Sequence, residues 1–156
     1  MNDIKWDKEH KLEHPSNGTL VFGYLPELKV VRGPTFSSGP IYLKYGVHYG
    51  PGRGFGFVHL WKAHFKHLEN HDDALVEVRR HVAEHLGGPV VLFHERESRV
   101  QAVRFRVGSL ILEAYQRPEP HFSVVSGGYM QEGKGTRVAR IDPSRVSTLP
   151  TNEKAP

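Results

Sequence analysis

The chain has no cysteine among its 156 residues, and it has no apolar run of the length that crosses a bilayer. The absence of cysteine excludes disulfide frameworks, thiolate nucleophiles and zinc sites built on cysteine. Residues 1–14 are charged throughout and lack the apolar centre of a signal peptide. We therefore expect no membrane partner.

The residues that are present suit one folded domain with a basic surface. Hydrophobic residues make up 38% of the chain, with eight Phe, six Tyr and two Trp, which is enough for a globular core. Lys and Arg outnumber Asp and Glu by 21 to 17, and there are eleven His. Histidine titrates near neutral pH and supplies acid, base or metal-ligand chemistry. A basic, histidine-rich chain favours a partner that carries phosphate, such as RNA.

Composition divides the chain into three segments. Residues 1–18 are predicted as a flexible polar arm that ends at a Pro-Ser-Asn-Gly turn. Residues 19–130 are predicted as a single α+β domain, and residues 131–156 as a basic, proline-containing tail.

Two helices are predicted in the first half of the chain. The first, over about residues 57–69, has an apolar stripe of Phe57, Leu60, Trp61, Phe65 and Leu68. The second begins at Asp72 or Asp73 as its cap and stops at Gly87-Gly88-Pro89. Its apolar stripe is Leu75, Val78, Val82 and Leu86.

The second half is predicted to form strands. Four short β-prone runs follow Pro89 and are joined by tight polar or Gly/Pro turns, at residues 90–95, 100–107, 110–115 and 122–126. Such close spacing favours an antiparallel meander. Shorter β-prone runs precede the helices at 20–25, 29–32 and 41–50. The predicted fold is α+β, with two helices packed on a mainly C-terminal four-stranded antiparallel sheet.

The histidines of the first helix do not share one face. On a helical wheel His64 lies within the apolar stripe, whereas His59 lies about 140° away, toward the polar side. In the first turn, His59 would be next to backbone N–H groups at the positive end of the helix dipole, which attract phosphate and disfavour an imidazolium. The alternatives are an exposed surface histidine at position 59 and a hydrogen-bonded core histidine at position 64.

Metal binding is not predicted. His64, His67 and His71 are spaced i, i+3, i+7, but this is not an HExxH arrangement and no carboxylate completes the set. His81 and His85 form an i, i+4 pair that we expect to be solvated. We expect no metal and no cofactor.

The glycine-rich segment 52–56 is too weak to indicate a nucleotide fold, because it lacks the Gly-Lys-Ser/Thr of a phosphate loop. It fits a tight turn between a strand and a helix that presents Arg53 to an anion.

The run YLKYGVHYGPGRGFGFVHLWKAH, residues 42–64, resembles a signature of phage- and toxin-associated ribonuclease domains. These belong to the barnase/EndoU/colicin/RelE-like superfamily. The matching residues are Gly54, Gly56, His59, Leu60 and His64, preceded by Lys44 and His48. The resemblance extends over about residues 40–130 and includes Ser126 and Tyr129 near the end of the last predicted strand.

The resemblance implies a metal-independent endoribonuclease, and a catalytic role for the 19–130 domain. The RNA 2′-hydroxyl attacks the adjacent phosphate and leaves a 2′,3′-cyclic phosphate, which requires a base, an acid and a cation. His59 is expected as base or acid, with His48 or His64 as its partner. The remaining expected roles are phosphate cations at Lys44 and Arg104, phosphate positioning by Ser126 or Tyr129, and RNA contacts from Arg53 and Arg106.

The implied partners are RNA, either tRNA or mRNA, and an immunity protein or antitoxin. The implied location is the cytoplasm, including that of a target cell reached as part of a larger toxin. Two other functions stay open: a non-enzymatic nucleic-acid-binding module, and a phage accessory domain that has lost activity.

Overall fold

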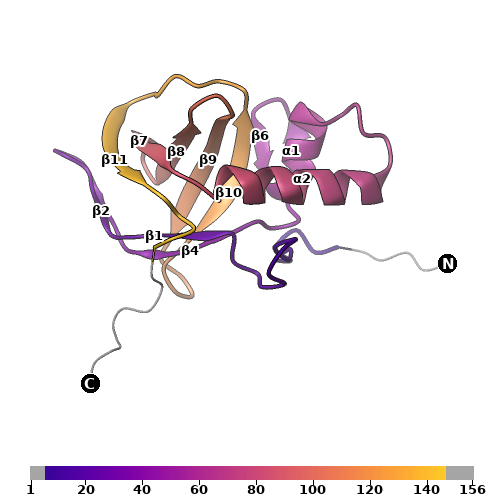
Figure 1. Cartoon of the computed structure of the whole chain (residues 1–156), viewed down its shortest axis with the longest axis horizontal. Coiled ribbons are helices and arrows are strands. Elements are labelled where there is room, and N and C mark those ends of the chain that lie inside the picture. The colour runs from indigo at the N-terminus through magenta and orange to yellow at the C-terminus, as the bar shows by residue number, and fades with distance from the viewer. Residues whose placement is uncertain (1–5, 147–156) are drawn as a thin grey trace.

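The structure is a computed structural model that describes residues 6–146 of the chain. The strands within this range are β1 (Gly23–Leu25), β2 (Leu28–Lys29), β3 (Thr35–Phe36), β4 (Gly39–Tyr42), β5 (Val47–Gly50), β6 (Arg53–Phe55), β7 (Val90–Arg96), β8 (Arg99–Arg104), β9 (Gly108–Tyr115), β10 (His121–Gly128) and β11 (Thr136–Ile141). The helices are α1 (Gly56–His64) and α2 (His71–His85), between the early strands and the later ones. Figure 1 shows the two helices on one side of the sheet.

The main sheet has seven strands in the order β1-β4-β10-β9-β8-β7-β11. The fold is α+β as expected, but the expectation of a four-stranded antiparallel sheet was wrong. The predicted meander is its centre, β7 to β10, and three further strands lie on its edges. The pairing of β4 with β10 is parallel, so the sheet is mixed.

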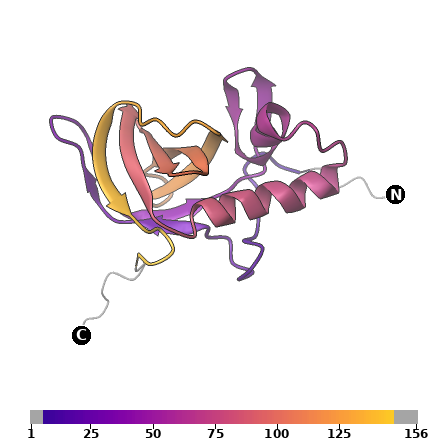
Figure 2. The same cartoon turned by 45° about the horizontal axis from the view of Figure 1, so that its top comes forward.

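The additional strands pair with the two edges of the meander. A four-stranded meander leaves two edges with unpaired backbone N–H and C=O groups. The β4 strand pairs with β10 at one edge and is itself paired with β1, while β11 covers the other edge along β7. Figure 2 shows the resulting sheet curving strongly.

Both ends of the described chain contribute to the fold. Leu12 is buried and its N–H donates to the carbonyl of Leu43, and Trp6 stacks on Tyr45 with ring centroids 5.0 Å apart. Residues 6–18 were expected as a flexible arm, but these contacts hold the segment against the domain. The β11 strand likewise lies within the segment that was expected to be a tail.

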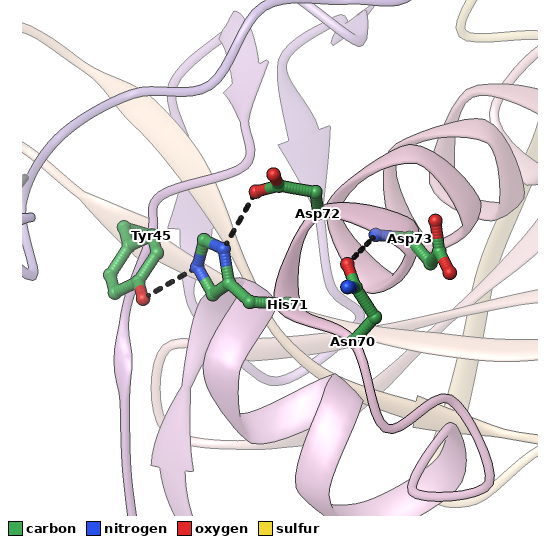
Figure 3. A network of polar contacts seen from close by, with 5 residues as sticks. All are labelled: Tyr45, Asn70, His71, Asp72 and Asp73. Carbon is green, nitrogen blue, oxygen red and sulfur yellow. Dashed lines mark hydrogen bonds and ion pairs between the residues drawn. The ribbon is translucent and has the colours of Figure 1, made fainter. Parts of the chain in front are cut away.

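The helices differ from expectation at their ends. The α1 helix stops at His64, five residues before the predicted end, and a turn follows in which the Trp61 indole N–H donates to the carbonyl of Leu68 at 2.7 Å. The cap of α2 is Asn70, whose side chain accepts from the N–H of Asp73 at 3.0 Å (Figure 3). The expected cap at Asp72 or Asp73 was therefore wrong by two or three residues.

The start of α2 is linked to the segment that leads into β5. The hydroxyl of Tyr45 and Nε2 of His71 are 3.0 Å apart, and Nδ1 of His71 is 3.2 Å from a carboxylate oxygen of Asp72 (Figure 3). Burial raises the pKa of Tyr45, so its hydroxyl stays protonated and donates to the imidazole.

The core lies between α2 and one face of the sheet. On α2, Val78, Val82 and Leu86 are fully buried, and they belong to the same core cluster as Leu110 and Leu112 of β9. No helix within residues 6–146 is both long enough and apolar enough to span a membrane.

A buried histidine in this core should make stability depend on pH. His85 is fully buried, and its Nε2–H donates to the carbonyl of Ala102 at 2.9 Å. Burial lowers the pKa of His85 to about 4, from an ordinary value near 6.5. The unfolded chain therefore binds a proton more readily than the folded one. This contribution to stability is complete above pH 6.5 and is lost as the pH falls toward 4.

We predict a loss of about 3 kcal/mol in the free energy of unfolding between pH 7 and pH 4 from His85 alone. His85→Gln keeps an N–H donor for the Ala102 carbonyl but does not titrate. Urea unfolding of both proteins at the two pH values isolates the effect. Equal losses in the wild type and the variant would contradict the assignment.

Candidate active site

The face of the sheet opposite α2 carries a row of polar side chains. Strand register places Arg99 of β8 beside Glu113 of β9, and Gln101 beside Ile111. Alternation along the strands directs these residues away from the core face, where Val100 and its alternate neighbours are buried. Gln101 is only 2% exposed, because the segment before β11 covers it: its side chain donates to the carbonyl of Glu132 at 3.1 Å and accepts from the N–H of Lys134 at 2.8 Å. Arg99 and Glu113 are the partly exposed members of this row.

At one end of this row, two histidine rings touch each other. Nδ1 of His48, on β5, lies 2.9 Å from Nδ1 of His59, on α1. The rings are stacked, with centroids 5.0 Å apart and planes 30° apart. His59 is 2% exposed, whereas His48 is partly exposed.

The burial of His59 differs from the helical-wheel expectation. The β5–β6 hairpin pairs Val47 with Phe55 and covers the first turn of α1, so the polar side of the helix does not face solvent there. The first-turn amides are also occupied, because Phe57 donates to the carbonyl of Lys44 and Val58 to that of Tyr45. These two amides are therefore not available to a phosphate.

Gly54 allows the hairpin to approach the histidine pair. A Cβ atom at position 54 would lie 2.3 Å from the carbonyl oxygen of Val47 and 2.9 Å from Nδ1 of His59. The residue also has φ of +140°, a conformation that side chains rarely adopt. Glycine is needed here for the contact between the two rings.

The surroundings of His59 favour its neutral form. Burial lowers the pKa of His59, and the positive charges of His48, His64 and Arg99 lower it further. Burial also lowers the pKa of His64. Both rings are therefore neutral near neutral pH, and a neutral imidazole has one nitrogen that can accept a proton.

The Nδ1-to-Nδ1 contact fixes the protonation of the pair. A hydrogen bond at 2.9 Å needs one proton between the two nitrogens, so one ring is the Nδ1–H donor and the other accepts. When both rings are neutral, the donor has a bare Nε2 and the acceptor carries its proton on Nε2. The pair therefore presents one base and one acid at the same time.

His64 is the last residue of α1 and lies beside the end of β10. Its ring approaches Gly128 and lines a hollow of about 370 Å³ together with Ser126, Gln101 and Glu95. A carboxylate oxygen of Glu95 is buried without a hydrogen-bond partner in the described structure. The hollow thus has polar walls beside the histidines.

Arg99 supplies positive charge on the same face. Its Nε lies 3.2 Å from Oε1 of Glu113, and the other carboxylate oxygen of Glu113 accepts from the hydroxyl of Ser98 at 2.8 Å. This contact fixes one edge of the guanidinium and leaves its terminal nitrogens for an anion.

The structure brings some of the expected site residues together and separates others. His48 and His59 contact each other, and His64 is close enough for its charge to lower the pKa of His59. His64 and Ser126 line one hollow, and Tyr129 is an exposed residue at its rim. Lys44 is buried at a different hollow, where its Nζ lies 3.0 Å from a carboxylate oxygen of Glu9.

The expected arginines lie elsewhere. Arg104 projects toward α2 and donates to the carbonyl of Glu84, so it is on the opposite face of the sheet from Arg99. Arg106 is in the turn after β8, where its backbone N–H donates to the side chain of Gln131, and Arg53 is exposed on β6.

Sequence reasoning missed Arg99 and Glu113. It predicted a strand over residues 100–107 with Arg104 as a phosphate cation, but β8 is Arg99–Arg104 and Arg104 faces α2. The signal for the correct face was the alternation of Arg99 and Gln101 with the apolar Val100 and Ala102.

No three His, Asp or Glu side chains within residues 6–146 come together as metal ligands do. Comparisons of the chain with protein-family models, with curated proteins and with solved structures found no match. The arguments for function therefore depend on the geometry of the site.

A substitution at Gly54 tests how the histidine pair is held. We predict that Gly54→Ala will destabilise the fold by about 2–4 kcal/mol, because it adds a backbone clash to the cost of a strained φ. It should also shift the ring NMR signals of His48 and His59.

Gly52→Ala is the matched control, because Gly52 has φ of +69° and nothing within 4 Å of its Cβ position. It should cost only about 1–2 kcal/mol and leave the ring signals unchanged. Equal costs and unchanged ring signals in both variants would show that Gly54 does not govern the pair.

Proposed function

We propose that this protein is a metal-independent endoribonuclease of the toxin-like kind, similar to the barnase/EndoU/colicin/RelE-like ribonucleases. The observation that carries the proposal is the Nδ1-to-Nδ1 hydrogen bond between His48 and His59, on the same face as His64 and Arg99. RNA cleavage by its own 2′-hydroxyl needs a base and an acid, and this pair supplies both.

The reaction balances without water or a cofactor. The bare Nε2 of one ring takes the proton of the 2′-hydroxyl while O2′ forms a bond to phosphorus. The bond from phosphorus to O5′ breaks, and O5′ takes a proton from Nε2–H of the other ring. The products are a 2′,3′-cyclic phosphate and a free 5′-hydroxyl.

The hydrogen bond between the rings keeps the pair neutral during this transfer. As one Nε2 gains a proton and the other loses one, the proton between the Nδ1 atoms moves to the second ring. The pair ends in the mirror tautomeric state, with base and acid exchanged. Avoiding a separated ion pair matters because His59 is buried, where charge is costly.

The other polar groups fit supporting roles. The free edge of the Arg99 guanidinium stabilises the negative charge that develops on the phosphate, and Glu113 holds it in orientation. The hollow beside His64, with Ser126, accommodates a neighbouring nucleotide. In this scheme His64 contacts the substrate, and His48 is the proton-transfer partner of His59.

The substrate class is RNA, either tRNA or mRNA, and the site of action is the cytoplasm, including that of a target cell. A nuclease of this kind requires an immunity protein or antitoxin in the cell that makes it. Poor expression in the absence of such an inhibitor would agree with the proposal.

Cleavage of a fluorescent RNA oligonucleotide in EDTA tests the function. We predict cleavage that leaves a 2′,3′-cyclic phosphate, and no cleavage when the scissile nucleotide is 2′-deoxy. His48→Ala and His59→Ala should each lower the rate by about 10²–10⁴-fold, because each removes a proton carrier. His67→Ala is the matched control, since His67 is exposed beyond the end of α1, and it should retain the wild-type rate.

Three outcomes would contradict the proposal. Salt-sensitive RNA binding without cleavage would indicate a nucleic-acid-binding module. Neither binding nor cleavage would indicate an accessory domain without activity. Cleavage that EDTA abolishes would indicate metal-dependent chemistry at another site.

A further inference from the structure

A second hollow, of about 300 Å³, lies where β9 ends and β10 begins, beyond the Arg99–Glu113 pair. The residues that line it are mostly cationic or aromatic: Lys11, Lys44, Tyr115, Arg117, Pro118 and His121, with Glu9 as the one carboxylate. Tyr115 follows Glu113 on the same face of β9, so this hollow continues the row that contains the histidine pair.

The cations of this hollow are held in place by aromatic rings. The Lys44 ammonium lies 4.8 Å from the centre of the Tyr115 ring, and Lys11 lies 4.1 Å from the centre of the Tyr42 ring. His121 stacks on Tyr115, with centroids 5.1 Å apart and planes 16° apart. Cations fixed in this way are arranged for an anion before it arrives.

One polar atom in the hollow has no partner in the described structure, and the buried Lys44 ammonium is paired only with an exposed carboxylate. His121 is 7% exposed; its Nδ1–H donates to the carbonyl of Glu119 at 2.8 Å, and its Nε2 is buried without a partner in the described structure. Lys44 is 8% exposed, and its one carboxylate contact is Glu9, a largely exposed side chain at 3.0 Å. A phosphate oxygen that replaced the Glu9 carboxylate would be an equivalent anionic partner for the Lys44 ammonium.

We propose that this hollow binds a phosphate group of a nucleic-acid strand, and that Glu9 occupies the anion position in the free protein. The inference rests on the proposed function, because the phosphate bound here is a neighbour of the phosphate whose bond is cleaved at the histidine pair. It assigns Lys44 to the flanking phosphate rather than to the reacting one. Lys11 and Arg117, which line the same hollow, complete the cationic set.

Binding of a 2′-deoxy tetranucleotide tests the inference without any need for cleavage. We expect Lys11→Gln and Arg117→Gln each to weaken binding about threefold to tenfold at low salt. Each should also reduce the slope of log affinity against log salt by about 0.7, the value for one lost phosphate contact on a single strand. Glu9→Gln should tighten binding, since it removes the carboxylate that competes for Lys44.

Arg140→Gln is the control, because Arg140 is exposed on β11, at the far edge of the sheet. Weakening by Arg140→Gln equal to that of the hollow variants would indicate only general charge attraction and overturn the proposal. So would wild-type affinity in Glu9→Gln. Inorganic phosphate is the second probe, and affinity for it equal to that for the tetranucleotide would identify a free-phosphate site instead. If binding behaves as expected but RNA is not cleaved, the subsite stands and the proposed nuclease function fails.

Discussion

The hydrogen bond between Nδ1 of His48 and Nδ1 of His59 is the interaction on which the account of this protein depends. Each ring uses one nitrogen in the bond, so the two remaining nitrogens have complementary protonation when the pair is neutral. Histidine pairs joined in this way can move a proton in at one end and out at the other without forming a separated charge. The burial of His59, which would otherwise make a charged ring costly, is compatible with proton transfer for this reason.

The rest of the fold holds that bond in position. The β5–β6 hairpin carries His48 and covers the first turn of α1, and Gly54 lets its backbone approach His59. The first turn of α1 is tied to the carbonyls of Lys44 and Tyr45, which follow β4. Because β4 is itself paired with β10, the histidines are connected through backbone hydrogen bonds to the centre of the sheet.

The polar face of the sheet places further groups beside the pair. Arg99 and Glu113 come from neighbouring strands, the hollow near His64 lies toward the end of β10, and the cationic hollow lies at the other end of the row. A single strand of RNA that follows this row would place successive phosphates over positive charge. Lys44 and His64 both belong to the segment 42–64 that resembles the ribonuclease signature, but they line different hollows.

Local patterns in the sequence predicted the local structure well and the long-range pairing poorly. The meander of β7 to β10 and the stop of α2 before Pro89 followed from alternation and from glycine and proline positions. The β-prone run predicted at 41–50 overlaps the end of β4, but its parallel contact with β10 joins segments about 80 residues apart, and no local pattern predicts such a pairing.

The candidate site was predictable only where it depends on local sequence patterns. The glycine-histidine pattern indicated His48, His59 and His64, and the structure puts His48 in contact with His59 and His64 near His59. The phosphate cations were harder to assign, because they depend on which residues of β8 face away from α2. Alternation along β8 puts Arg104 and Arg99 on opposite faces, and only the packing of α2 shows that Arg104 is on the covered face.

The measurement that tests the central claim most directly is ¹⁵N NMR of the histidine rings at pH 7.5, with assignments from His48→Gln and His59→Gln variants. The account predicts that one ring of the pair carries its proton on Nδ1 and the other on Nε2, with a shared, strongly downfield proton between the Nδ1 atoms. Two rings that both carry their protons on Nε2 would have no proton for this bond, and that result would contradict the account.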